Sequence, residues 1–293
     1  MGSPTLVTSE PDVVIGPDGL PRLSQAYLDA YERFMQTLVT EDDRPVDNLF
    51  SAKQARLLIV TLYASWTHPR FGRRFIADGN IGVFYAFHQP PVVPDMFLSL
   101  DVAPPADLWK KASRSYFIWE YGKPPEVVVE IVSNTEGEEE EPDGKLGIYG
   151  RMKVERYIVY DPGRQTGSEP LRVYALERGR LVRMDETWFD DLGLGVTLWR
   201  GEYQGCEDTW LRWCNRDSAV IPTGEERAEA ERARAETEHA RAEAERERAE
   251  AERARAEAER ERAETERARA EAERERAERL AAKLRAAGID PDA

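Results

Sequence analysis

The chain has 293 residues, of which 41% are hydrophobic and 33% charged, and its formal net charge is −15 at pH 7. A mean hydropathy of −0.63 fits one globular domain of medium size joined to a very polar segment better than two full domains. The longest apolar run, residues 57–66, is about half of a membrane span and no export signal is recognisable, so we expect neither a membrane protein nor an exported one.

Cysteine content and charge bear on the compartment and on partners. Cys206 and Cys214 are too few for a disulfide framework, and no second pair completes a zinc site, so we expect a cytoplasmic protein in a reducing compartment. The negative net charge opposes binding to nucleic acid, whose phosphates attract clustered Lys and Arg. Two basic clusters, at residues 70–74 and 110–114, reduce this objection, although such clusters are more often solvated surface.

The first 20 residues mix Pro, Gly, Ser and Asp without periodicity and are predicted to form a flexible N-terminal arm. A globular domain should then occupy residues 21–220, because nearly every aromatic and β-branched residue lies before position 225. This domain should open with two amphipathic helices, at Ser24–Leu38 and from Ser51 to about Trp66, each with its serine as the N-cap.

After residue 66 the period changes from helical to extended, and Gly, Pro or Asn separates the segments. The strands predicted before the acidic loop are 75–77, 82–87, 95–100, 116–120 and 127–132. Past that loop we expect a short helix at Lys145–Met152, a strand from Arg156, and a hairpin joining 171–176 to 181–184. Strands on both sides of helices indicate a mixed α/β or α+β fold.

One residue in the most hydrophobic predicted strand is unsuited to burial. Residues 127–132 read Val-Val-Val-Glu-Ile-Val, which is typical of a strand buried on both faces, and Glu130 lies inside this run. An unpaired carboxylate there would be costly. Either an ion pair or a water-facing strand end compensates the charge, or Glu130 is a metal ligand or a catalytic acid.

Three residues together suggest hydrolytic chemistry. Asp95 begins one predicted strand, Glu130 lies inside the next strong strand, and Lys145 opens the helix that follows. Two carboxylates can hold a divalent cation that polarises a phosphate, and a lysine can position water or stabilise negative charge. His68 and His88 have no HExxH or HxH partner, and no GxSxG, P-loop or GxGxxG motif occurs in a strand-to-helix context.

Four segments in this order resemble the Uma-type (Uma two) family of endonucleases, which belongs to the PD-(D/E)XK nuclease superfamily. They are PPVVPDMFLSLDV around Asp95, KPPEVVVEIVSN around Glu130, GKLGIYGRMKVERYIVYDP from Gly144 to Pro162, and LRAAGIDP from Leu284 to Pro291. No single segment is specific, so their order carries the resemblance. The resemblance implies a restriction-endonuclease-like mixed sheet flanked by helices.

The same resemblance implies a metal-dependent endonuclease that hydrolyses phosphodiester bonds of nucleic acid, with Mg²⁺ or alternatively Mn²⁺ as cofactor. DNA is the expected substrate, and the choice between DNA and RNA stays open. It implies that Asp95 and Glu130 hold the metal and that Lys145 is the catalytic lysine. The superfamily lysine two residues beyond the second carboxylate would fall at Val132, so its role must have moved to the following helix. Family analogy further implies a homodimer.

Three residues near this constellation have simpler interpretations. Glu136 and Glu139 lie on the acidic loop and are candidate additional ligands, but an acidic loop is more often only solvated. Tyr149 follows Lys145 by one helical turn and is interpreted as core packing.

Residues 225–287 are predicted to form a charged helix, followed by a short tail at 288–293. The sequence repeats ERxRAEx every seven residues, which places alanines on one stripe, but no second apolar position persists. Glu and Arg pairs three and four residues apart stabilise a single helix instead. A solitary helix and a weak coiled coil therefore both stay open, and either form could contact a partner protein.

Two functions from different classes fit these observations. The first is the endonuclease. The second is a nuclease-fold scaffold or binding protein that cleaves little and oligomerises through the C-terminal helix, which the acidic net charge and the displaced lysine favour. A different metal-dependent hydrolase is a third reading that only the carboxylates support.

Overall fold

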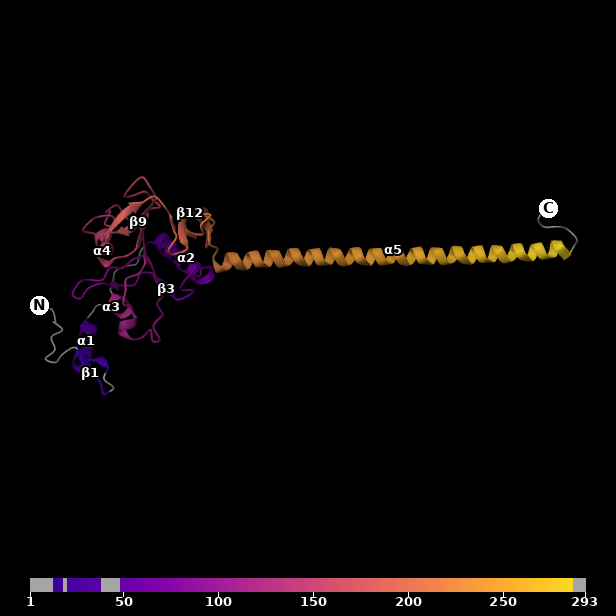
Figure 1. The fold of residues 1–293 in the computed structure, drawn as a ribbon. Helices are drawn as coiled ribbons and strands as arrows, with labels where there is room; N and C mark the ends of the chain where they lie inside the picture. Colours follow the sequence, from indigo (N-terminus) through magenta and orange to yellow (C-terminus); the bar gives the residue numbers. More distant parts are fainter. Residues whose placement is uncertain (1–12, 18–19, 38–47, 287–293) are drawn as a thin grey trace. The chain divides into compact units, whose positions relative to one another are not determined.

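The computed structural model of this chain describes residues 13–17, 20–37 and 48–286. The chain divides into two compact units, Met1–Glu226 and Arg227–Ala293. The first combines a mixed β-sheet with helices, and a long charged helix occupies the second (Figure 1). The fold class predicted from the sequence is thereby confirmed.

A six-stranded mixed sheet is the centre of the first unit. Its strands are β3 (Phe75–Asp78), β5 (Met96–Leu100), β7 (Val127–Ile131), β8 (Arg156–Tyr160), β9 (Leu171–Glu177) and β10 (Arg180–Met184). Their order in the sheet is β10-β9-β8-β7-β5-β3. Among the described strands of this sheet, only β7 and β8 pair in parallel, and helix α4 (Lys145–Met152) connects them. A parallel pair needs such a crossover, which places a helix on one face of the sheet.

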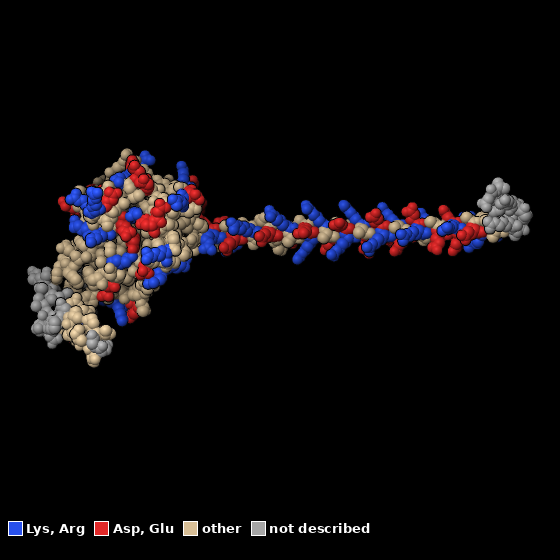
Figure 2. Space-filling model, viewed as in Figure 1, with Lys and Arg blue, Asp and Glu red and all other residues tan. Residues whose placement is uncertain are grey.

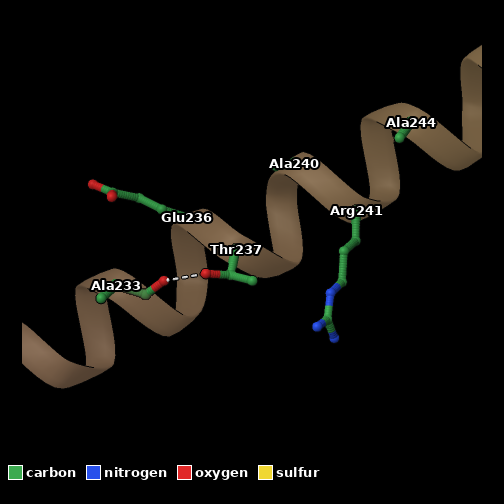
Figure 3. Close-up of a pocket in the computed structure, with 6 residues that line it drawn as sticks. All are labelled: Ala233, Glu236, Thr237, Ala240, Arg241 and Ala244. Carbon is green, nitrogen blue, oxygen red and sulfur yellow. Dashed lines mark hydrogen bonds between the residues drawn. The ribbon is translucent and has the colours of Figure 1, made fainter.

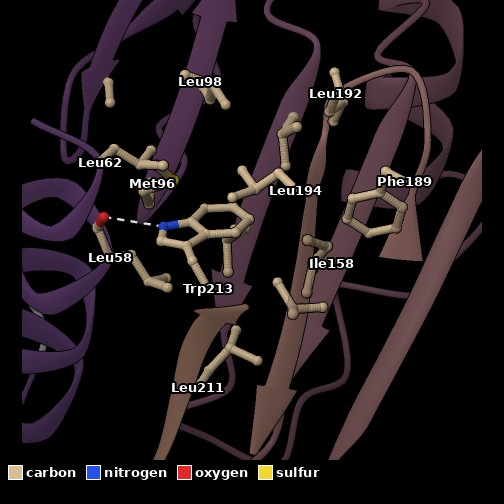
Figure 4. Close-up of a cluster of buried hydrophobic side chains, with 14 of the residues drawn as sticks. Leu58, Leu62, Met96, Leu98, Ile158, Phe189, Leu192, Leu194, Leu211 and Trp213 are labelled. Atoms are coloured by element: carbon tan, nitrogen blue, oxygen red, sulfur yellow. Dashed lines mark hydrogen bonds between the residues drawn. The ribbon is translucent and has the colours of Figure 1, made fainter. Parts of the chain in front are cut away.

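The first face of the sheet is covered by helix α2 (Leu49–Ser65) and a long hairpin. The hairpin strands β12 (Leu194–Tyr203) and β13 (Cys206–Cys214) join the short β11 (Trp188–Phe189) in a second sheet. Trp213 fills the space between the layers, and its indole N–H donates to the carbonyl of Leu58 at 3.0 Å (Figure 4). Because the indole nitrogen has a partner, this large ring can be buried fully.

Helix α4 packs on the opposite face. Its buried side chains, Tyr149 and Met152, join a cluster with Phe97, Val128 and Tyr157 from the strands beneath. Side chains alternate between the two faces of a strand, so every second residue of β7 points toward α4. Glu130 has the same parity as Val128 and lies on this face.

Smaller elements complete the first unit. They are β1 (Val13–Ile15), β2 (Pro21–Leu23), α1 (Gln25–Thr37), β4 (Val83–Phe84), the 3-10 helix η1 (Lys111–Ser113), β6 (Tyr116–Phe117) and α3 (Ile118–Tyr121). β1 and β2 form a hairpin, and β4 pairs in parallel with β6. Of the arm expected at residues 1–20, residues 1–12 and 18–19 lie outside the described residues, as does the tail at 288–293.

Most predicted elements occur, with three corrections. The second helix is capped by Asn48 and not by Ser51, because the Asn48 side chain accepts the backbone N–H of Ser51 at 3.0 Å. The strand expected at 116–120 ends after Phe117, and the next four residues form α3. The strand expected at 82–87 shortens to β4. Ser24 caps α1 as predicted, since its hydroxyl accepts the N–H of Tyr27.

Helix α5 (Gly224–Ala286) accounts for the charged repeat. Arg alternates with Glu along it, and both signs of charge mix over the visible face of the first unit (Figure 2). Its alanines leave a shallow depression, in which the Thr237 hydroxyl donates to the carbonyl of Ala233 (Figure 3). No helix among the described residues is both long and apolar enough to span a membrane. The choice between a solitary helix and a coiled coil stays a prediction.

Candidate active site

Strand register brings the two candidate carboxylates together. Met96 of β5 pairs with Val129 of β7 in an antiparallel ladder, so the next position along sets Asp95 opposite Glu130. Directly opposed residues of an antiparallel pair project from the same face, with Cβ atoms about 4.5–5.5 Å apart. The two residues lie 35 positions apart in the sequence. Both are more than nine-tenths buried.

Glu130 receives hydrogen bonds from two residues of α4. Lys145 Nζ lies 2.7 Å from Oε2, and the Tyr149 hydroxyl donates to Oε1 at 2.5 Å. The pair of donors follows from helical spacing, because residues four apart lie on one face of a helix. Each carboxylate oxygen of Glu130 is thus held by a different side chain, which fixes the orientation of the group.

The backbone at Ile131 and at Gly79 lies close to Asp95 and fixes its position. Its Oδ2 accepts the backbone N–H of Ile131 at 2.5 Å, which ties the end of β5 to β7. On the other side, a Cβ atom at Gly79 would lie 2.0 Å from the carbonyl oxygen of Asp95. Only glycine fits at position 79 without moving Asp95.

Burial and charge shift the titration of this cluster. Burial raises the pKa of Glu130, and the opposing influence of the Lys145 charge and the two hydrogen bonds does not cancel it. Desolvation acts to lower the pKa of Lys145, but the charge and hydrogen bond of Glu130, together with Asp95 and Glu139, raise it above its usual value. Lys145 therefore stays an ammonium at neutral pH.

Glu139 of the acidic loop is buried beside the cluster. It is 7% exposed, and its Oε2 atom has no hydrogen-bond partner in the described part of the chain. The Tyr157 hydroxyl donates to its backbone carbonyl at 2.9 Å and holds the loop against the sheet. The expectation that this residue is only solvated is wrong. Glu136, by contrast, is exposed on the loop.

Tyr149 is the second residue whose role the sequence did not reveal. It is fully buried, as core packing requires, but it also donates a hydrogen bond to Glu130. The signal was present in the sequence, because Tyr149 follows Lys145 by four residues on a helix next to the Glu130 strand. An aromatic residue at that spacing is so common in protein cores that the pattern alone could not separate the two roles.

The carboxylates of this site fit a divalent cation that needs few protein ligands. Three carboxylates, Asp95, Glu130 and Glu139, against the single ammonium of Lys145 leave an excess of negative charge that a divalent cation would offset. Within residues 13–17, 20–37 and 48–286, no group of three or more His, Cys, Asp or Glu side chains is placed to hold a metal ion. Mg²⁺ needs only one or two carboxylates because it keeps several waters, so this arrangement suits Mg²⁺ better than zinc.

A mixed sheet with two facing carboxylates, and a lysine on the helix that connects its parallel pair, defines a restriction-endonuclease-like domain. Residues 43–196, more than half of the chain, match the model of the family Uma2, described as "Putative restriction endonuclease". The chain belongs to this family, as its resemblance predicted. No curated protein and no solved structure matched the chain.

Proposed function

We propose that this chain is a metal-dependent endonuclease that hydrolyses phosphodiester bonds of DNA, with Mg²⁺ as its cofactor and Mn²⁺ as a substitute. One observation carries the proposal: Glu130 is a fully buried carboxylate on the same sheet face as Asp95, with the ammonium of Lys145 2.7 Å away. Membership of a nuclease family supports it. A buried carboxylate whose pKa burial raises is costly to keep for packing alone.

In this proposal Asp95 and Glu130 hold the metal ion. The bound ion would polarise the scissile phosphate and acidify a water molecule. The hydrogen bond from Tyr149 keeps the Glu130 side chain in one rotamer, so its carboxylate oxygens would already be oriented when the metal ion binds. This order matters because Mg²⁺ requires nearly ideal octahedral geometry.

Lys145 contributes positive charge and not basicity. Its raised pKa keeps it protonated, so it cannot take a proton from the attacking water. As an ammonium it donates hydrogen bonds, which orient that water and stabilise the negative charge that develops on the phosphate oxygens. Its side chain is 28% exposed, so the head group can turn from Glu130 toward a bound phosphate.

The test is nicking and cleavage of supercoiled plasmid with Mg²⁺ or Mn²⁺. Wild type is compared with Glu130→Ala and Lys145→Ala, and with Glu186→Ala and Lys283→Ala as matched controls at exposed positions. Metal-dependent cutting should be lost in the first two variants and kept in the controls. Cutting that survives both site substitutions, or no cutting under any metal, would overturn the proposal.

A nuclease-fold scaffold that cleaves little is the second candidate. It is favoured by the lack of any three-ligand metal group within the described residues. Thermal unfolding with and without Mg²⁺ separates the two, because stabilisation by the metal would require both carboxylates, whereas a scaffold would be indifferent to Asp95→Ala and Glu130→Ala.

We also propose a homodimer, in keeping with cleavage of both strands of DNA by paired subunits, and α5 as its contact or as a surface for a partner protein. The alanine stripe of α5 supports this only weakly, because alanine buries little area. Light scattering of the full chain and of a chain ending at residue 226 tests it. A dimer that becomes monomeric on truncation supports contact through α5.

A further inference from the structure

A pocket with aromatic walls lies beside the candidate active site. It has a volume of about 160 Å³, and it is enclosed by the sheet, by α2 and by the loop between β5 and β6. We call it the tyrosine pocket, and its chief lining residues are Tyr63, Asp78, Phe97, Leu108, Ser115 and Tyr121. Neither the family match nor the proposed chemistry gives it a role.

The register of the sheet places this pocket next to the carboxylates. Asp78 of β3 pairs directly with Phe97 of β5, so both side chains project from one face. Asp95 lies two residues before Phe97 and has the same parity. Two residues along a strand span about 7 Å. The pocket and Asp95 are therefore about as far apart as a base and the phosphate of the same nucleotide.

The pocket offers polar groups that lack a full set of partners. Ser115 is 3% exposed, and its hydroxyl has no hydrogen-bond partner among the described residues. Buried polar atoms are nearly always paired, and Ser115 lines the pocket, so its unpaired hydroxyl favours a polar ligand there. Asp78 lies at the accessible rim, where partial desolvation raises the pKa of its carboxyl group. Its carboxylate can accept from an exocyclic amine.

Aromatic rings supply the remaining walls. Tyr121 stacks on Tyr116 with ring centroids 4.4 Å apart and planes at 8°, which holds both rings rigidly. Tyr63 lines the pocket and is 44% exposed. Rigid aromatic side chains next to hydrogen-bonding groups are the usual surroundings of a nucleobase that has left its stack.

The loop that forms the outer wall adds contacts for a nucleic-acid strand. Leu108 is 66% exposed on that wall, and the adjacent Trp109 is 84% exposed, which is unusual for a tryptophan. The basic cluster Lys110, Lys111 and Arg114 follows directly. An exposed indole beside positive charge is the combination that binds single strands, by stacking on bases and attracting phosphates.

We propose that the tyrosine pocket binds one unstacked nucleobase of the substrate strand, beside the phosphate that the carboxylate site would cut. This inference rests on the proposed function and narrows its substrate to nucleic acid with an unpaired or readily extruded base. Trp109 stacks on the neighbouring base, and Lys110 attracts the phosphate between them. A fully paired duplex binds more weakly because a base must first be extruded.

The test measures binding without cleavage, by fluorescence anisotropy of labelled trinucleotides in EDTA. An intact trinucleotide is compared with one that lacks its central base. Loss of the base should weaken binding about tenfold, as loss of one base–aromatic contact does. Leu108→Ala and Asp78→Asn should weaken binding of the intact trinucleotide and leave that of the abasic one unchanged. Leu49→Ala, at a similarly exposed leucine, is the control.

Equal affinity for the intact and abasic trinucleotides would overturn the inference. So would an affinity for the intact trinucleotide that neither Leu108→Ala nor Asp78→Asn changes. Both rim variants change exposed side chains, so loss of folding does not confuse the result. Plasmid cleavage with equal trinucleotide binding would leave the endonuclease proposal standing and refute the pocket. Base-dependent binding by a protein that cuts no plasmid would support the base-binding pocket and refute the endonuclease proposal.

Discussion

Replacing Glu130 with glutamine should make the metal-free protein more stable. The carboxylate is 1% exposed, and burial dominates the shift of its pKa despite Lys145 and Tyr149. Glutamine keeps the shape and removes the buried charge. Lys145 is not left stranded, because its side chain is 28% exposed and can turn to water.

The magnitude follows from comparable buried ion pairs. A neutral, isosteric replacement is often neutral to stabilising by about 1–4 kcal/mol, and we expect the low end because Lys145 loses its partner. A gain of about 1 kcal/mol raises the Tm by about 2–4 °C in a domain of this size. In Mg²⁺ the wild type should have the higher Tm of the two proteins, since only the wild type would gain stability from the bound ion.

The pH dependence has a definite sign. Because the folded pKa of Glu130 is raised, the folded state binds more protons than the unfolded state from about pH 4.3 up to the folded pKa. Stability of the wild type therefore falls as pH rises through that window, and this contribution is absent in Glu130→Gln. The difference between the two proteins should be largest above the window.

The assay is thermal unfolding in EDTA and in Mg²⁺ between pH 5 and 8.5. Glu126→Gln is the matched control, because Glu126 pairs with Lys123 and accepts the backbone N–H of Leu100 at 2.8 Å. That carboxylate is structural, so its substitution should destabilise by about 1 kcal/mol. A Tm of Glu130→Gln several degrees below wild type in EDTA would refute the reasoning and make Glu130 a structural ion-pair partner.

Three further predictions concern stability and the site. Glu226→Ala should lower the free energy of unfolding in urea by about 2–4 kcal/mol, because the buried Arg212 loses the carboxylate to which it donates two hydrogen bonds. A loss of less than about 0.5 kcal/mol would contradict this. The lowered pKa of Glu226 means that this stability is lost as pH falls below about 4.3. Tyr149→Phe should lose about 1 kcal/mol and slow plasmid cleavage while Glu130 remains; unchanged cleavage would assign Tyr149 to packing alone. Burial lowers the pKa of His68, so stability should fall as pH drops below about 6.5, and His68→Asn should remove that slope in thermal unfolding.

Much of the central architecture could be predicted from local patterns. The β-branched run of β7, the helix that begins at Lys145 and the hairpin of β9 and β10 all have periods and turn residues that belong to one segment of chain. Glu130 stood out for the same reason, because a charge inside an apolar run is visible without any knowledge of its neighbours. The hairpin of β12 and β13 was not predicted, although it covers one face of the sheet.

Only the tertiary structure decided what surrounds Glu130. Register placed Asp95 opposite it, and packing of α4 turned Tyr149 into a hydrogen-bond donor. From the sequence, Glu139 was interpreted as a solvated loop residue, and only the packing of the loop against Tyr157 shows that it is buried. The composition of the sequence determined that a charge had to be compensated within an apolar strand. Which groups compensate it depends on contacts between residues far apart in the chain, and such contacts are set by how sheet and helix pack, which no local period encodes.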